Sequence, residues 1–291
     1  MTDVTMTDVP EWFTRAIAIP AHSGAVEVAG CPIAYRHWGD ADKPALLLIH
    51  GYNAHSHWWD FIAPGLLPDY QVVAIDSSGA GDSGHRDHYD LDTYADEVIA
   101  VAQQAGIGES FTVIGHSFGA GIALKTATRF PERVNALIFL DAKVVPLPGE
   151  SRPRSTSGFL PNPIFPDEAT AIENFRVIPP QRCTNQYIID HIARHSIKAD
   201  DGGWTLKADA KLLDRFRFED QTDSLLELKT RFGLIYGTIS ALVSPSVVDY
   251  LQYIAPPRAP FVAIAGAAHH LFLDQPLAFT AELKTLLDNW R

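Results

Sequence analysis

The stretch VIGHSFGAG, residues 113–121, carries an apolar run directly into a serine that stands between two glycines. Gly115, Ser117 and Gly119 form the pattern G-x-S-x-G, with the run FTVIG before it and FGAGIALKTA after it. This order predicts a strand, a sharp turn that holds Ser117, and a helix. Because the turn strains the serine backbone, the residues two positions to either side must be small. The helix N-terminus would direct N–H groups and positive dipole toward the hydroxyl.

Similar apolar runs recur on both sides of this stretch. They lie at residues 45–49, 72–75, 110–114, 134–140, 232–236 and 261–265. Strands buried on both faces show such unbroken runs, which are typical of a parallel sheet covered by helices. Helix-like stretches separate them at residues 92–105, 119–129 and 277–290, and residues 25–28 and 32–38 predict a leading hairpin. The alternation favours an α/β fold with a mostly parallel, doubly wound sheet.

The alternation stops between residues 146 and 228. The segment opens with VVPLPGESRPRSTSGFLPNPIFP, residues 144–166, whose proline, serine and glycine content is typical of a loop. Helix-like pieces follow around residues 172–174, 185–195 and 209–217. We therefore expect a core formed by residues 1–145 and 229–291, and a helical cap formed by residues 146–228. Such a cap covers a site at the C-terminal ends of the strands.

The composition sets limits on partners and location. The 291 residues carry a formal net charge of −12, which argues against nucleic acid and against an anionic membrane surface as partners. No run approaches the ~18 apolar residues of a membrane-spanning helix. Cys31 and Cys183 are far apart and suggest no disulfide framework, and the N-terminal MTDVTMTDVPEWF shows no secretory pattern. A cytoplasmic setting is the expectation, and the sequence leaves the oligomeric state open.

Several further stretches, taken together, resemble the α/β-hydrolase superfamily, in its serine-nucleophile branch with a helical cap. LLLIHGYNAHSHWW (46–59) resembles the oxyanion loop after the third strand, and VVAIDSSGAGDSG (72–84) the D-x-x-G-x-G-x-S stretch. AGAAHHLFLDQP (265–276) resembles the histidine loop before the last helix, and DGGWTLKAD (201–209) a cap segment of some members. The resemblance runs from about residue 25 to residue 291.

The resemblance implies a nucleophile, a histidine base, an orienting acid and two backbone oxyanion donors. Ser117 takes the nucleophile position. His269 fits the pattern G-x-x-H with a proline seven positions later, and the adjacent His270 is the alternative base. The oxyanion donors are the backbone N–H groups of Phe118, which follows the nucleophile, and of Tyr52, which follows the His-Gly pair.

In many relatives the acid comes after the strand that follows the cap, three residues past a glycine. This chain has no acid at that position. That glycine is Gly237 here, and Ser240 stands at the acid position. A serine cannot carry the negative charge that stabilises an imidazolium. Some members instead place the acid after the preceding strand, where Asp141 directly follows the run NALIFL. We expect Asp141 to be the acid; a Ser-His dyad, or an acid from elsewhere, is the alternative.

Serine at the elbow indicates acyl-enzyme chemistry on a carbonyl. It disfavours the epoxide hydrolase and haloalkane dehalogenase branches of the superfamily, which have aspartate at that position. We expect a carboxylic ester or lactone as substrate, and the cap favours a small, fairly apolar molecule. A C–C bond hydrolase of aromatic degradation is one alternative, although such enzymes carry more glycines in the oxyanion loop. A non-hydrolytic receptor or a lyase is the other, since a receptor would tolerate Ser240 in place of an acid.

Neither a cofactor nor a metal ion is expected. The glycines of residues 79–84 follow a strand but are better explained as the hydrolase loop than as a dinucleotide motif. His50, His55 and His57 match no strong zinc spacing, and no carboxylate or cysteine near them in sequence completes a set.

Overall fold

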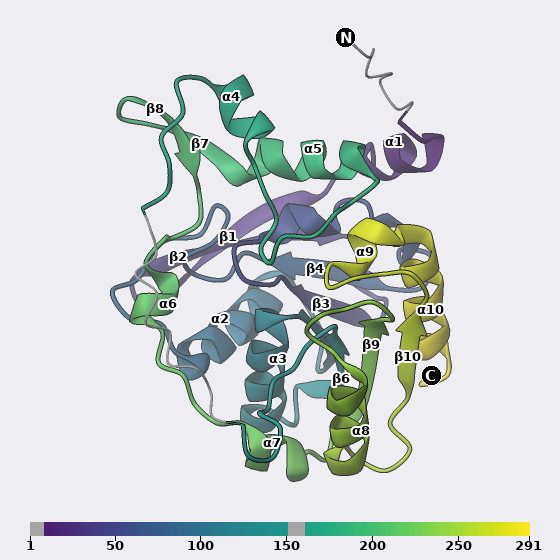
Figure 1. Ribbon diagram of the computed structural model, residues 1–291. Coiled ribbons are helices and arrows are strands. Elements are labelled where there is room, and N and C mark those ends of the chain that lie inside the picture. Colours follow the sequence, from purple (N-terminus) through teal and green to yellow (C-terminus); the bar gives the residue numbers. More distant parts are fainter. Residues whose placement is uncertain (1–8, 151–160) are drawn as a thin grey trace.

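The computed structural model describes residues 9–150 and 161–291, and its centre is one eight-stranded sheet (Figure 1). The strand order is β1-β2-β4-β3-β5-β6-β9-β10. β1 pairs with β2, and β2 with β4, in antiparallel fashion, whereas all other neighbours are parallel. The bounds are β1 His22–Val28, β2 Cys31–Trp38, β3 Ala45–Ile49, β4 Gln71–Ile75, β5 Phe111–His116, β6 Val134–Leu140, β9 Arg231–Gly237 and β10 Phe261–Ile264. The predicted fold class is confirmed.

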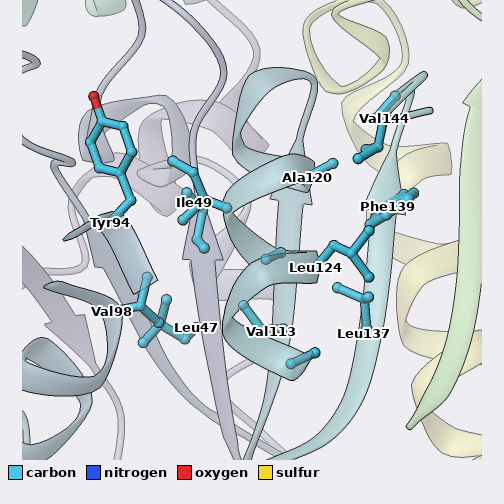
Figure 2. Packing of buried hydrophobic residues seen from close by; sticks show 14 of the residues in the cluster. Leu47, Ile49, Tyr94, Val98, Val113, Ala120, Leu124, Leu137, Phe139 and Val144 are labelled. Carbon is cyan, nitrogen blue, oxygen red and sulfur yellow. The ribbon is translucent and has the colours of Figure 1, made fainter. Parts of the chain in front are cut away.

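Helices cover both faces of the sheet, which explains why its central strands are apolar throughout. α2 (Leu91–Gln104), α3 (Phe118–Arg129) and α8 (Pro245–Ile254) pack on one face. The 3₁₀ turns η1 (Ser56–Trp59) and η2 (Ala63–Gly65), with α1 (Glu11–Ile17), α9 (Leu271–Asp274) and α10 (Pro276–Asp288), lie on the other. Figure 2 shows the first layer, where side chains of β3, β5 and β6 contact Ala120 and Leu124 of α3.

A buried ion pair fixes the loop after β4 to helix α2. Glu97 is fully buried; Arg86 Nε lies 2.9 Å from its Oε1, and the N–H of Ser78 donates to its Oε2 at 3.0 Å. Arg86 also donates to the carbonyl of Val28 at 2.8 Å. Burial raises the pKa of the Glu97 carboxyl. The Arg86 side chain thus connects three segments that are distant in sequence: the loop after β4, helix α2 and the end of strand β1.

We expect Glu97→Ala to lower the free energy of unfolding by about 3–5 kcal/mol, because it leaves the Arg86 guanidinium buried without its partner. Guanidinium denaturation followed by circular dichroism measures this change. Glu132→Ala removes an exposed carboxylate of the same type and should stay within about 0.5 kcal/mol of the unchanged protein. A loss below about 1 kcal/mol for Glu97→Ala would show that the pair adds little.

The segment between β6 and β9 has two parts with different partners. α4 (Glu168–Glu173) and α5 (Gln186–Ser196) lie over the face that carries η1 and α9. α6 (Leu212–Arg215) and α7 (Thr222–Leu226) join the opposite core, where α7 contacts α3 at the base of the molecule (Figure 1). Only the first part lies above the sheet in the manner expected of a cap, and residues 151–160 of the expected loop lie outside the described residues.

The cap also contains a hairpin that helical periodicity does not predict. β7 (Ile197–Asp200) pairs with β8 (Gly203–Leu206) in antiparallel fashion. Asp201 and Gly202 form the two-residue loop, and Gly202 and the following Gly203 have φ of 90° and 152°, a region that side-chain-bearing residues rarely adopt. The cap segment therefore holds this strand pair beside its helices, because the Asp-Gly loop closes a hairpin.

The structure describes both cysteines and the helices among which a membrane span would be found. Cys31 and Cys183 are both free thiols, and burial raises the pKa of Cys183 to about 11. Among the helices of residues 9–150 and 161–291, none combines the length and the apolar composition needed to cross a bilayer.

Candidate active site

Ser117 occupies the sharp turn between β5 and α3. Its backbone has φ 52° and ψ −115°, a region that costs a non-glycine residue about 1–3 kcal/mol. Its N–H donates to the carbonyl of Leu140 at 3.0 Å, so the serine is tied to the residue that precedes Asp141. The side chain is half-buried, and the first N–H groups of α3 beside it lack acceptors within the helix.

Packing requires both glycines that flank the serine. A Cβ at Gly119 would lie 2.4 Å from the carbonyl oxygen of His50. A Cβ at Gly115 would lie 2.3 Å from the carbonyl oxygen of Gly119. Both distances are far below a permitted contact, and both neighbours are backbone atoms that cannot rotate away. The spacing G-x-S-x-G is thus explained by the close approach of β3, β5 and α3.

Gly119→Ala should therefore displace the loop after β3 and lower both stability and hydrolytic activity, the latter at least about 100-fold. Gly121→Ala is the matched control two residues further along α3. Its Cβ would meet only side-chain atoms, the amide of Gln221 at 3.1 Å and Leu91 Cδ2 at 4.0 Å, and alanine is the better helix former. Thermal unfolding and initial rates of ester hydrolysis measure the two effects. Equal behaviour of the two variants would contradict the packing argument.

The predicted base and the predicted acid are in contact. His269 Nδ1 lies 2.8 Å from Asp141 Oδ2, and both side chains are buried. Because the carboxylate accepts, the Nδ1–H donates and the lone pair is left on Nε2. Asp141 itself has φ 43°, a second strained backbone at the end of a strand, and its N–H donates to the carbonyl of Ile235 at 2.8 Å. β6, β9 and the histidine loop thus converge at this carboxylate.

Ser240, the residue at the position where many relatives carry the acid, donates its hydroxyl to Asp141 Oδ2 at 2.6 Å. The N–H of Gly237 donates to Asp141 Oδ1 at 2.9 Å. Asp141 therefore receives three hydrogen bonds, counting that of His269, which is what a buried carboxylate requires. The serine at this position thus supplies a hydrogen-bond donor to Asp141, the predicted acid, which follows β6. Sequence reasoning found the exchange of positions but not this contact.

The second ring nitrogen of His269 faces away from Asp141. Within the described part of the chain, His269 Nε2 is buried and has no hydrogen-bond partner. Contacts between a base and its nucleophile commonly tighten only when substrate is bound. A buried nitrogen without a partner costs about 1–3 kcal/mol, so the site is prepared for a donor.

His116, the variable residue before the nucleophile, was not singled out by sequence reasoning. Its ring is buried, and Nε2 lies 3.1 Å from the carbonyl oxygen of His269, which it can only approach as a donor. Burial lowers the pKa of His116 well below its ordinary value, so the ring is neutral. The contact ties the backbone of the base to the elbow. The only sequence signal was its place inside G-x-S-x-G.

The loop after β3 approaches the serine through Gly51, where a Cβ would lie 3.3 Å from Ser117 Cβ. This places the peptide before Tyr52 beside the nucleophile, as an oxyanion donor requires. His50 braces the loop: its Nε2 accepts the N–H of Ser77 at 3.1 Å and its Nδ1 donates to the carbonyl of Gly51 at 2.7 Å. Asp76 adds a second brace by accepting the N–H of Ser56 at 2.6 Å.

The second histidine of the pair has a different environment. His270 Nε2 contacts the carbonyl oxygen of Pro179 at 3.1 Å, and the backbone N–H of His270 donates to Gln181 Oε1 at 2.8 Å. Burial lowers the pKa of His270 to about 3. Asp274 accepts the N–H of Ala268 at 2.8 Å and so fixes the loop around both rings. His270 thus connects the histidine loop to the cap, and His269 is the ring that faces Asp141.

The three histidines considered as metal ligands in sequence serve separate partners. His50 braces the oxyanion loop, whereas His55 Nε2 contacts Ser196 Oγ of α5 at 2.8 Å. His57 Nδ1 contacts Asp60 Oδ2 at 2.7 Å. These three histidines form no common site. His57 instead belongs to a group with Asp60 and two histidines of α5.

A family model described as the alpha/beta hydrolase fold matches residues 44–276, and the chain belongs to that family of hydrolytic enzymes. The match includes the elbow, the oxyanion loop, Asp141 and the histidine loop. The chain is similar to a bifunctional esterase/perhydrolase of Acinetobacter calcoaceticus, with 34% identity over 140 residues. That match covers 47% of this chain and only half, 50%, of the relative's length.

Two further relatives match over most of their length. A pimeloyl-[acyl-carrier protein] methyl ester esterase of Klebsiella pneumoniae is 26% identical over 255 residues, 83% of this chain and 92% of the relative. Epoxide hydrolase 1 of Caenorhabditis elegans is 32% identical over 284 residues, 88% of this chain and 68% of the relative. The relatives share the hydrolase family and differ in the bond that their names describe.

Proposed function

We propose that the chain is a serine hydrolase that cleaves a carboxylic ester or a lactone through an acyl-enzyme. The observation that carries the proposal is the hydrogen bond between His269 Nδ1 and Asp141 Oδ2, 2.8 Å, at the strand edge where Ser117 forms the elbow. A strained serine at the edge of the sheet and an imidazole oriented by a carboxylate are the parts that acyl transfer needs.

In this mechanism Ser117 Oγ attacks the carbonyl carbon while His269 Nε2 takes the hydroxyl proton. The backbone N–H groups of Phe118 and Tyr52 bind the oxygen that becomes negative. Asp141 holds the ring in the Nδ1–H tautomer and stabilises the imidazolium. His269 then returns the proton to the leaving alcohol oxygen, and the acyl group stays on Ser117. Water, deprotonated by His269, attacks the acyl carbon; the bond to Ser117 Oγ breaks, His269 returns the proton to that oxygen, and the acid leaves.

The nucleophile decides between the two kinds of relative. The epoxide hydrolase branch of the superfamily carries aspartate at the elbow, whereas the residue here is Ser117. A serine can form an acyl ester from a carbonyl substrate and is regenerated when water cleaves it. The name of the full-length esterase relative supports the same chemistry.

The environment of the nucleophile supports a compact, fairly apolar substrate. The half-buried ring of Phe118 packs edge-on against Phe216, with ring centroids 5.1 Å apart, and against Tyr94 at 5.9 Å. Tyr52 is half-buried against the same cluster. Apolar rings next to the serine favour binding of a short acyl or alkyl group and give little binding energy to a charged one.

The test is hydrolysis of p-nitrophenyl esters from acetate to octanoate, with γ- and δ-lactones alongside, by the unchanged protein and by Ser117→Ala. A fluorophosphonate probe, read by intact mass, reports whether Ser117 reacts as a nucleophile. We expect turnover of short esters or lactones and one probe adduct, both lost in Ser117→Ala. Absence of both turnover and adduct in the unchanged protein would reject the serine hydrolase. An adduct without turnover of any ester or lactone would reject the substrate class alone.

A further inference from the structure

A second group of histidines lies away from Ser117, at the contact between the cap and the core. His57 and Asp60 belong to the core in and just after η1, and His191 and His195 lie one helical turn apart on α5. One possible ligand atom from each of the four lies within 4.8 Å of the others. All four side chains are partly or fully buried, and none has a role in the acyl-transfer mechanism.

The geometry centres on one oxygen. Asp60 Oδ2 lies 2.7 Å from His57 Nδ1 and 2.9 Å from His191 Nε2. Two imidazole nitrogens therefore point at a single carboxylate oxygen from opposite sides of the cap–core contact. A divalent ion with tetrahedral Zn–N and Zn–O bonds of about 2.0–2.1 Å sets its ligands about 3.3 Å apart. An ion at this point requires the three atoms to separate by only about half an ångström.

The other carboxylate oxygen is already held in the way that metal ligands are. Arg36 Nε lies 3.1 Å from Asp60 Oδ1, which orients the carboxylate and leaves Oδ2 for the imidazoles.

His195 lies next to these three groups. Its ring is stacked on that of His57, with centroids 3.7 Å apart and an interplanar angle of 4°. Because the nitrogen lone pairs lie in the ring plane, His195 has to rotate about its side-chain bonds before it can bind the same ion as His57 as a fourth ligand. His191 and His195, four residues apart, face the same side of α5, as paired helical metal ligands do.

We propose that His57, Asp60, His191 and His195 bind one divalent transition-metal ion of the zinc class. Imidazole nitrogens with one carboxylate oxygen are ligands that zinc, nickel and copper accept. Binding requires His57 to carry its proton on Nε2 instead of Nδ1. Arg36 Nη1, which lies 3.4 Å from that nitrogen, then turns aside, while its Nε contact with Asp60 remains.

The ion would fasten the cap to the oxyanion loop. η1 begins four residues after Tyr52, and His55 of the same loop contacts Ser196 Oγ at the end of α5, at 2.8 Å. A metal ion bound by both α5 and η1 would join the cap to this loop at a second point, in addition to the contact between His55 and Ser196. We therefore expect metal binding to raise thermal stability and to slow any movement of α5 away from the core.

The test is titration of the metal-free protein with Zn²⁺ by calorimetry, with thermal unfolding in parallel. We expect one ion per chain and a rise in Tm of about 5 °C at a hundredfold excess of Zn²⁺ over Kd. His195→Gln and His191→Gln should each weaken binding by more than about 100-fold, because they remove a ligand directly. Circular dichroism without metal shows whether each variant is folded, and the visible spectrum of bound Co²⁺ gives a second measure of four-coordinate binding.

Two variants make the result specific. His88→Gln removes an exposed histidine and should bind Zn²⁺ like the unchanged protein. His116, His269 and His270 form the other histidine group of the described residues within 4.8 Å, and His269→Gln removes one of them. If His269→Gln abolishes binding while His195→Gln leaves it unchanged, the ion lies at the active centre and the proposal is wrong. Absence of stoichiometric binding to the unchanged protein would also overturn it.

Discussion

Ser117→Ala should lower kcat/KM for a p-nitrophenyl ester by roughly 10⁵-fold, because it removes the atom that forms the acyl bond. The residual rate comes from the oxyanion donors and from binding, which the substitution leaves in place. The fold should be unaffected, since the Ser117 N–H still donates to Leu140 and the side chain is half-buried. Initial rates with each variant at several ester concentrations give the ratio.

Ser246→Ala is the matched control for this change. Ser246 is an exposed serine at the start of α8, far from the elbow in sequence, and its loss should leave kcat/KM within a factor of two. The fluorophosphonate adduct should disappear in Ser117→Ala and persist in Ser246→Ala. A Ser117→Ala protein that retains more than a hundredth of the activity would show that another group is the nucleophile.

The sheet and the elbow could be predicted because both depend on short-range patterns. Strands β3, β4 and β5 are buried along their whole length, so β3 is an unbroken apolar run and the other two are mostly apolar. The elbow needs glycine at two fixed positions because the backbone of β3 passes next to α3. The position of Asp141 could also be predicted, since the residue that follows a parallel strand lies at the same sheet edge as the residues that follow the neighbouring strands.

Contacts between distant segments could not be predicted in the same way. The hydroxyl of Ser240 meets Asp141 across 99 residues, and His191 meets Asp60 across 131 residues. Each depends on the direction in which one side chain leaves a turn or a helix, and no local pattern records that direction. The β7–β8 hairpin was missed for a related reason, because the two-residue loop Asp201-Gly202 decided the structure of a segment whose flanks resemble helices.

Asp141→Asn should lower kcat/KM by about 10⁴-fold while the protein stays folded. The amide oxygen of the new side chain would accept the N–H of Gly237, which now donates to Oδ1 at 2.9 Å. Its NH₂ group would then face His269 Nδ1 and hold the proton on the wrong nitrogen. A loss of less than tenfold would indicate a Ser-His dyad or an acid from elsewhere, and Asp141 would be a structural residue only.

The position of Ser240 allows a sharper experiment, in which the acid is moved rather than removed. Ser240 Oγ lies 2.6 Å from the same Asp141 oxygen that contacts His269, so a carboxylate at residue 240 can reach His269 Nδ1. Adding Ser240→Asp to Asp141→Asn should therefore restore at least about tenfold of the lost activity. Ser244→Asp in the same background adds the same charge at the start of α8 and should restore nothing.

The single variant Ser240→Asp gives the complementary result. It would place two carboxylates against one another in a buried site, and their repulsion raises the pKa of one of them. The shared proton weakens the hold on His269, so activity at neutral pH should fall and should recover as pH rises through the raised pKa. A pH profile of kcat/KM measures this shift. If Ser240→Asp changes neither the profile nor the Asp141→Asn background, the carboxylate near His269 does not control the base, and the dyad explanation gains instead.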